Sequence, residues 1–193
     1  MQKIYVNQEI CDRFIEEFSR ATNKLIVGYP FDKATDVGSL ITPKEVNRVE
    51  EWVNEAIENG AKLITGGKRI SDTCFEPTVL FNPSEDSKVS VNEIFDPVVC
   101  IYPFADREEA IKKANALDVH FRAAVFTKNI DIALEVTKKL NATAFRINDN
   151  TVFRVEWMPF GGRDTSGLGM GGISYTINDM TRDKMMVFKS KNL

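Results

Sequence analysis

The fold is indicated most clearly by residues 42–65, which read TPKEVNRVEEWVNEAIENGAKLIT. The opening segment Thr42-Pro43-Lys44-Glu45 combines a helix N-cap, a proline in the first helical position and a capping-box glutamate. Apolar residues then recur at helical spacing and make one stripe: Val46, Val49, Trp52, Val53, Ala56 and Ile57. Asn59-Gly60 is expected to end this helix, and residues 61–65 have the character of a strand. The segment therefore predicts a helix, a turn and a strand in succession.

The same alternation continues through the rest of the chain. Strands are expected at residues 4–6, 98–102, 123–126 and 144–147, and helices at residues 10–25, after Asp106 and at residues 132–140. Strands alternating with helices of this length pair in parallel through crossover connections. We therefore predict an α/β fold of three layers, α/β/α, with a mostly parallel sheet. A long glycine-bearing loop at residues 151–172 follows the last strand, where such folds often carry their chemistry.

Length and composition are those of an ordinary globular protein. The 193 residues suffice for one substantial domain, and we predict a single domain over residues 1–193. The formal net charge of -3 comes from interspersed signs, so nucleic-acid binding is not expected. No apolar run approaches the roughly 18–20 residues that span a bilayer, and the first residues lack the apolar core of a signal peptide. These features predict a cytoplasmic protein.

The cysteines and the histidine do not indicate a metal site. Cys11, Cys74 and Cys100 are odd in number and widely spaced, and His120 is the one histidine of the chain. This pattern matches neither a zinc cluster nor a disulfide framework. Reduced thiols without a catalytic role are the expected state, and we predict no metal.

Three motifs in colinear order resemble the downstream half of an NAD(P)-dependent aldehyde dehydrogenase. They are Glu93-Ile94-Phe95-Asp96-Pro97-Val98, Met158-Pro159-Phe160-Gly161-Gly162 and Ser166-Gly167-Leu168-Gly169. Within the family, the residues most similar to the branch that includes lactaldehyde, succinate-semialdehyde and phosphonoacetaldehyde dehydrogenases are Asn148-Asp149, Phe153-Arg154 and the Met158 to Gly162 run. The resemblance implies a catalytic domain that lacks the nucleophile segment and the dinucleotide-binding domain, since the family's nucleophilic cysteine lies just upstream of the strand matched by Lys3-Ile4-Tyr5-Val6.

The resemblance also assigns roles to five residues. Glu93 would accept hydrogen bonds from the hydroxyls of the nicotinamide ribose, and Phe95 would pack beside the nicotinamide. Phe153 and Phe160 would form walls of the aldehyde tunnel, and Arg154 would pair with a carboxylate or phosphonate on the substrate. Without the family context, Glu93 reads as a solvated carboxylate, the phenylalanines as core residues and Arg154 as a surface arginine.

Aldehyde oxidation in this family proceeds by thiolate attack, hydride transfer and hydrolysis of the thioester. The resemblance places the nucleophile and the general base outside this sequence, so we predict no catalytic residue and no activity or cofactor binding by the chain alone. In the complete enzyme we expect NAD or NADP, a small aldehyde, anionic if Arg154 binds it, and a homo-oligomer. The alternative is a stand-alone, non-catalytic domain that kept the fold and acts as a binding or assembly partner.

Several residues depart from the glycines of the family pattern and bear on these alternatives. Asp96 is expected to place a second negative charge beside Glu93 and so to weaken cofactor binding. The match puts His120 in a turn, where it is expected to be solvated. If such a position needed a positive φ, the side chain would cost about 1–2 kcal/mol.

Overall fold

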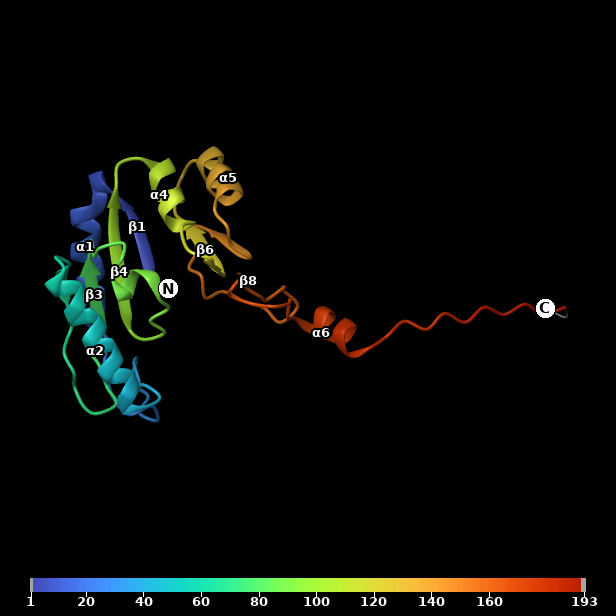
Figure 1. The fold of residues 1–193 in the computed structure, drawn as a ribbon, viewed down its shortest axis with the longest axis horizontal. Coiled ribbons are helices and arrows are strands. Elements are labelled where there is room, and N and C mark those ends of the chain that lie inside the picture. Colours follow the sequence, from blue (N-terminus) through green and yellow to red (C-terminus); the bar gives the residue numbers. More distant parts are fainter. Residues whose placement is uncertain (1, 192–193) are drawn as a thin grey trace. The chain divides into compact units, whose positions relative to one another are not determined.

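A four-stranded sheet organises the first part of the chain in the computed structural model, which describes residues 2–191 (Figure 1). Its strands are β1 (Lys3–Asn7), β2 (Lys62–Thr65), β3 (Thr78–Phe81) and β4 (Val98–Phe104), in the spatial order β1-β4-β3-β2. β4 pairs in parallel with both β1 and β3, and only β2 runs antiparallel to its neighbour. The predicted mostly parallel sheet is therefore confirmed.

Two helices cover the two faces of this sheet. On one face, α2 (Pro43–Glu58) packs its buried stripe against alternate residues of β3 and β4, including Leu80 and Cys100. On the other face, α1 (Gln8–Thr22) packs against Val79 and Ile101. Because successive residues of a strand point to opposite faces, β3 and β4 each supply residues to both cores. This arrangement is the predicted α/β/α layering.

The boundaries of α2 follow the sequence signals, but the side-chain capping contacts do not, since the Thr42 side chain makes no cap hydrogen bond. Thr42 is the N-cap and Pro43 is the first helical residue, and the helix ends at Asn59 before Gly60, whose φ is 97°. The Glu45 amide donates to the Thr42 carbonyl oxygen at 3.1 Å. The predicted capping-box role of the Glu45 side chain is wrong, because its carboxylate pairs with the Arg48 guanidinium.

The chain divides into two compact units, residues 1–110 and residues 111–193. The prediction of one domain over the whole chain stays a prediction. The short helix α3 (Lys88–Val91) belongs to the first unit, and α4 (Arg107–Ala114) crosses the boundary. As predicted, Asp106 caps α4, since its Oδ1 accepts from the Glu108 amide at 3.1 Å.

The second unit contains a parallel pair of strands joined by a helix. β6 (Arg122–Val125) and β7 (Ala144–Ile147) pair in register from Arg122↔Ala144, and α5 (Ile130–Lys139) connects them. A two-residue antiparallel pair, β5 (Val119–His120) with β8 (Arg163–Asp164), lies in the same unit, and α6 (Ile173–Met180) follows. Across residues 2–191, none of the helices combines the length and the apolar character needed to cross a membrane.

Candidate functional site

The segment that carries Glu93 and Phe95 connects α3 to β4. Its side chains alternate between the core and the surface: Ile94 is 1% exposed, whereas Glu93 is exposed and Phe95 is 89% exposed. Phe95 has a φ of 59°, a left-handed conformation that costs a bulky residue about 1–3 kcal/mol. The positive φ therefore falls on Phe95 and not on Asp96, so the strain considered for Asp96 does not arise.

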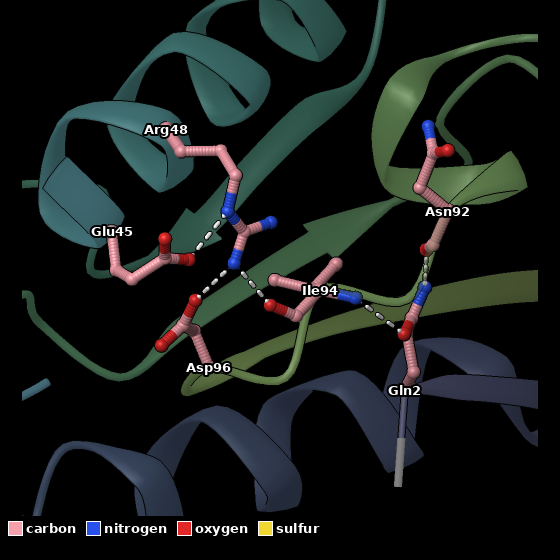
Figure 2. Close-up of polar contacts among 6 residues, drawn as sticks. All are labelled: Gln2, Glu45, Arg48, Asn92, Ile94 and Asp96. Carbon is pink, nitrogen blue, oxygen red and sulfur yellow. Dashed lines mark hydrogen bonds and ion pairs between the residues drawn. The ribbon is translucent and has the colours of Figure 1, made fainter. Parts of the chain in front are cut away.

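Polar contacts to Gln2 hold the beginning of this segment (Figure 2). The Gln2 side-chain nitrogen donates to the carbonyl oxygens of Val89 and Asn92 at 3.0 and 2.6 Å, and its oxygen accepts from the Ile94 amide at 3.0 Å. The Gln2 carbonyl oxygen accepts from the Cys100 amide, which ties Gln2 itself to β4. One side chain thus satisfies three backbone groups of α3 and of the turn that precedes Phe95.

Arg48 of α2 holds the other end of the segment (Figure 2). Its Nη2 donates to the Ile94 carbonyl oxygen at 2.6 Å and pairs with Asp96 Oδ2 at 2.7 Å. Burial raises the pKa of the Asp96 carboxyl, and the neighbouring Arg48 charge lowers it while Glu45 raises it. The Asp96 carboxylate therefore faces a guanidinium, and its predicted effect on cofactor binding at Glu93 stays a prediction.

In the second unit, Phe160 lies among cationic and aromatic groups. Its ring packs edge-on against Phe121 with centroids 5.1 Å apart. The guanidinium of Arg122 lies 5.0 Å from the Phe160 ring centroid, and that of Arg154 lies 4.4 Å from it. Arg154 also pairs with Glu156 at 3.3 Å. The structure thus brings two of the predicted residues, Arg154 and Phe160, into contact.

Phe153 is held by a different arginine. The Arg146 Nη2 donates to the Phe153 carbonyl oxygen at 2.7 Å, and the Arg146 guanidinium lies 5.5 Å from the Phe153 ring centroid. Arg122 donates to the Thr151 carbonyl oxygen at 2.9 Å. Because Arg122 and Arg146 belong to the paired strands β6 and β7, the sheet fixes the start of the predicted substrate loop.

Two glycines allow the close backbone path behind Phe160. A Cβ on Gly161 would lie 2.5 Å from the Gly169 carbonyl oxygen, and one on Gly162 would lie 2.2 Å from the Ser166 carbonyl oxygen. No other residue type fits at such distances. The stretch from residue 151 to 172 is irregular apart from β8 and a bridge between residues 160 and 171.

The expectation that His120 is solvated in a turn is wrong. His120 lies in β5 and is 6% exposed. Its Nδ1 lies 2.7 Å from Asp164 Oδ2 and 3.1 Å from the Asn141 amide nitrogen. The Asn141 amide nitrogen lies 3.2 Å from the same oxygen, and Arg163 donates to the Asn141 side-chain oxygen at 3.0 Å. The group joins β5 to β8 and is part of the structure of this unit.

The three free cysteines differ in accessibility, and we expect this difference to set their reactivity. Cys100 is fully buried and its pKa is raised to about 11 by burial, so almost no thiolate exists near neutral pH. Burial also raises the pKa of Cys11, whereas Cys74 is only half-buried. In a timed alkylation of the native chain followed by peptide mass spectrometry, Cys74 should react first and Cys100 only after unfolding. Modification of native Cys100 at the rate of Cys74 would contradict this order.

Four residues that contact the candidate segments were not predicted from the sequence: Gln2, Arg48, Arg122 and Arg146. They are identified only by the contacts that they make in the structure. Among residues 2–191, no group of three or more His, Cys, Asp or Glu side chains is placed to hold a metal ion.

Comparison with known proteins identifies the family. The aldehyde dehydrogenase family model matches residues 1–186. The chain belongs to the aldehyde dehydrogenase family. It is 39% identical over 187 residues to 3-sulfolactaldehyde dehydrogenase from Priestia megaterium and 36% identical over 185 residues to lactaldehyde dehydrogenase from Methanococcus maripaludis. These alignments cover 97% and 96% of this chain but 39% of each relative, so the chain spans about two-fifths of their length.

Solved structures of the family share the fold. Aldehyde dehydrogenase 21 from Physcomitrella patens, in complex with the reaction product succinate, matches with a TM-score of 0.90 and 34% identity over 93% of this chain and 37% of that one. Glyceraldehyde-3-phosphate dehydrogenase from Methanocaldococcus jannaschii, complexed with NADP, matches with a TM-score of 0.87 and 39% identity over 92% of this chain and 38% of that one. The predicted family and α/β fold are confirmed.

Proposed function

We propose that this chain is the downstream catalytic portion of an NAD(P)-dependent aldehyde dehydrogenase that oxidises a small, anionic aldehyde to its acid. Phe153 and Phe160 are the walls of the aldehyde tunnel, and Arg154 binds the anionic group of the substrate. Glu93 and Phe95 contact the cofactor. The supporting relatives are about two and a half times as long as this chain, since it covers 39% of each.

The observation that carries the substrate class is the contact between Arg154 and Phe160. A guanidinium beside an aromatic wall offers a cation for an anionic group and an apolar surface for the carbon chain. The ion pair between Arg154 and Glu156 is solvent-exposed, since the Glu156 side chain is 75% exposed. A substrate anion can therefore displace the Glu156 carboxylate at little cost. Two relatives fit this class by name, since one acts on 3-sulfolactaldehyde and another holds succinate.

The residues of the first unit fit a nicotinamide cofactor. The Glu93 carboxylate is exposed and offers two acceptor oxygens to the adjacent hydroxyls of a ribose. Phe95, 89% exposed, offers an aromatic surface two residues away. The cofactor, when bound, accepts hydride from the substrate, and the NADP in the Methanocaldococcus jannaschii relative is consistent with this role.

The chain alone is proposed to be inactive and to bind no cofactor. Cys11 and Cys100 are too buried to attack an aldehyde, and the resemblance assigns the nucleophile and the base to sequence outside these residues. The three free thiols are compatible with a reducing, cytoplasmic location. We further propose that the complete enzyme is a homo-oligomer and that a small-molecule aldehyde is its substrate.

A chimera tests the proposed function. In the Priestia megaterium enzyme, the segment that aligns with this chain is replaced by the corresponding residues of this chain, and reduction of NAD or NADP is followed with 3-sulfolactaldehyde. Aldehyde-dependent reduction supports the proposal. If the chimera folds but shows no aldehyde-dependent reduction under conditions in which the parent enzyme is active, the proposal is contradicted and the alternative of a non-catalytic domain is favoured.

In this chimera, replacing Arg154 by glutamine is expected to raise KM for 3-sulfolactaldehyde about tenfold or more, because a hydrogen bond between two charged groups is lost. KM for lactaldehyde, which is neutral, should change much less. Arg13→Gln, at an exposed position of α1, is the matched control and should alter neither value. Equal effects of Arg154→Gln on both substrates would show that Arg154 does not bind the anionic group.

A further inference from the structure

Asp96 and the Ile94 carbonyl oxygen are held by a single atom. Arg48 Nη2 contacts both of them, at 2.7 and 2.6 Å, so one nitrogen bridges the two residues that flank Phe95 (Figure 2). The left-handed backbone of Phe95 is costly, and such a conformation persists only where the surroundings determine it. The bridge closes the chain around Phe95 and supplies that constraint.

The Arg48 guanidinium is also held by two residues of its own helix. Its Nε donates to Glu45 Oε2 at 2.7 Å, and its guanidinium lies 4.4 Å from the Trp52 ring centroid. Glu45 and Trp52 belong to the same helix, whose neighbouring residues Val46 and Val49 are fully buried against the sheet. A guanidinium held in this way loses little further freedom when it binds Ile94 and Asp96.

The contacts to Gln2, Arg48 and the core hold only part of the segment. Ile94 is held through its amide by Gln2, through its carbonyl by Arg48 and through its side chain by the core. The side chains of Glu93 and Phe95, on either side of it, are exposed. The fixed residues therefore determine where the two exposed side chains lie.

We infer that Arg48, through its ion pair with Asp96, is a positioning residue for cofactor binding: it fixes the backbone that presents Glu93 and Phe95. This inference rests on the proposed function, in which Glu93 and Phe95 contact the cofactor. Asp96 stands where the family pattern has glycine, so the ion pair is a feature of this chain's own sequence. In this role Arg48 acts only through its contacts to Ile94 and Asp96.

The first measurement is hydrogen–deuterium exchange of the chain itself. Arg48→Met keeps an unbranched apolar stem but removes the guanidinium and its bridge, and the amides of residues 93–96 should exchange about tenfold faster. Arg69→Met is the matched control, because Arg69 makes a comparable ion pair with Glu50 of α2 at 2.7 Å. Arg69→Met should lower the free energy of unfolding without selectively speeding the exchange of the amides of residues 93–96.

The second measurement is steady-state kinetics of the chimera described above. Arg48→Met should raise KM for the cofactor about tenfold with little change in kcat or in KM for the aldehyde, and Arg48→Lys, which lacks the planar fork, should lie between. In the Asp96→Asn background the Arg48→Met effect should shrink, because the ion pair is already lost. Arg69→Met should leave the cofactor KM unchanged.

The outcomes separate the inference from the proposed function. If Glu93→Gln raises the cofactor KM but Arg48→Met changes neither that KM nor the exchange of residues 93–96, the positioning role is wrong and the proposed function stands. If Glu93→Gln leaves the cofactor KM unchanged, the proposed cofactor contact is wrong and the inference fails with it.

Discussion

Replacing Phe75 by alanine is expected to lower the free energy of unfolding of the first unit by about 3–5 kcal/mol. Phe75 is fully buried in the core cluster between α2 and the sheet, where it packs with residues such as Val49 and Leu80. Removing the ring loses its transfer free energy and leaves a cavity that close-packed neighbours fill only in part. Urea denaturation of the chain followed by Trp52 fluorescence measures the loss, because Trp52 packs against the same cluster.

Two further variants make this measurement specific. Trp157→Phe removes the tryptophan of the second unit, so that the fluorescence reports the first unit alone. Ile70→Ala changes a residue in the same connection between β2 and β3 that is 52% exposed, and should cost less than about 0.5 kcal/mol. A Phe75→Ala cost as small as that of Ile70→Ala would show that the described core does not carry the stability of this unit.

Elements with a clear sequence pattern were predicted, whereas α3, α6, β3, β5 and β8 were not. The stripe from Val46 to Ile57 has a clear helical period, and α2 was located to its ends. The strand β3 was not predicted, because its four residues from Thr78 to Phe81 are buried or half-buried on both faces and show no alternation. A short apolar run of this kind has no period that separates a strand from other buried structure.

Contacts between distant residues account for what the sequence did not show at the site. The motif around Glu93 was found through its family resemblance, but its partners Arg48 and Gln2 are separated from Ile94 by 46 and 92 positions. Local patterns contain no information about such pairs. The same reason explains the error at Glu45, where the capping-box pattern was present but Arg48 competes for the carboxylate.

Asp96 and His120 each have a partner that the sequence did not show. Asp96 was judged from its residue type, as an added charge, and His120 from the turn in which the family match put it. In the structure each has a partner far along the chain, Arg48 for Asp96 and Asp164 for His120. A partly buried charge or ring is stable only with such a partner, so departures from a family pattern need to be assessed in pairs.

Replacing Gly66 by alanine is expected to lower the free energy of unfolding by about 2–5 kcal/mol, the sum of two separate costs. Gly66 has a φ of 75°, which L-residues adopt at a cost of about 1–2 kcal/mol. In addition, a Cβ there would lie 2.2 Å from the Pro77 carbonyl oxygen and 2.8 Å from Thr78 Oγ1, so the backbone leading into β3 must move. That movement also weakens the 2.8 Å bond that the Gly67 amide donates to Thr78 Oγ1.

Gly60→Ala separates the two costs, because Gly60 has a φ of 97° but nothing lies within 4 Å of a Cβ built there. It should therefore show the conformational cost alone, about 1–2 kcal/mol, in the same urea denaturation. The difference between the variants measures the steric cost at Gly66. If both variants lost the same free energy, the backbone of residues 66–78 would be able to yield without penalty, and β3 would not be held as tightly as its burial indicates.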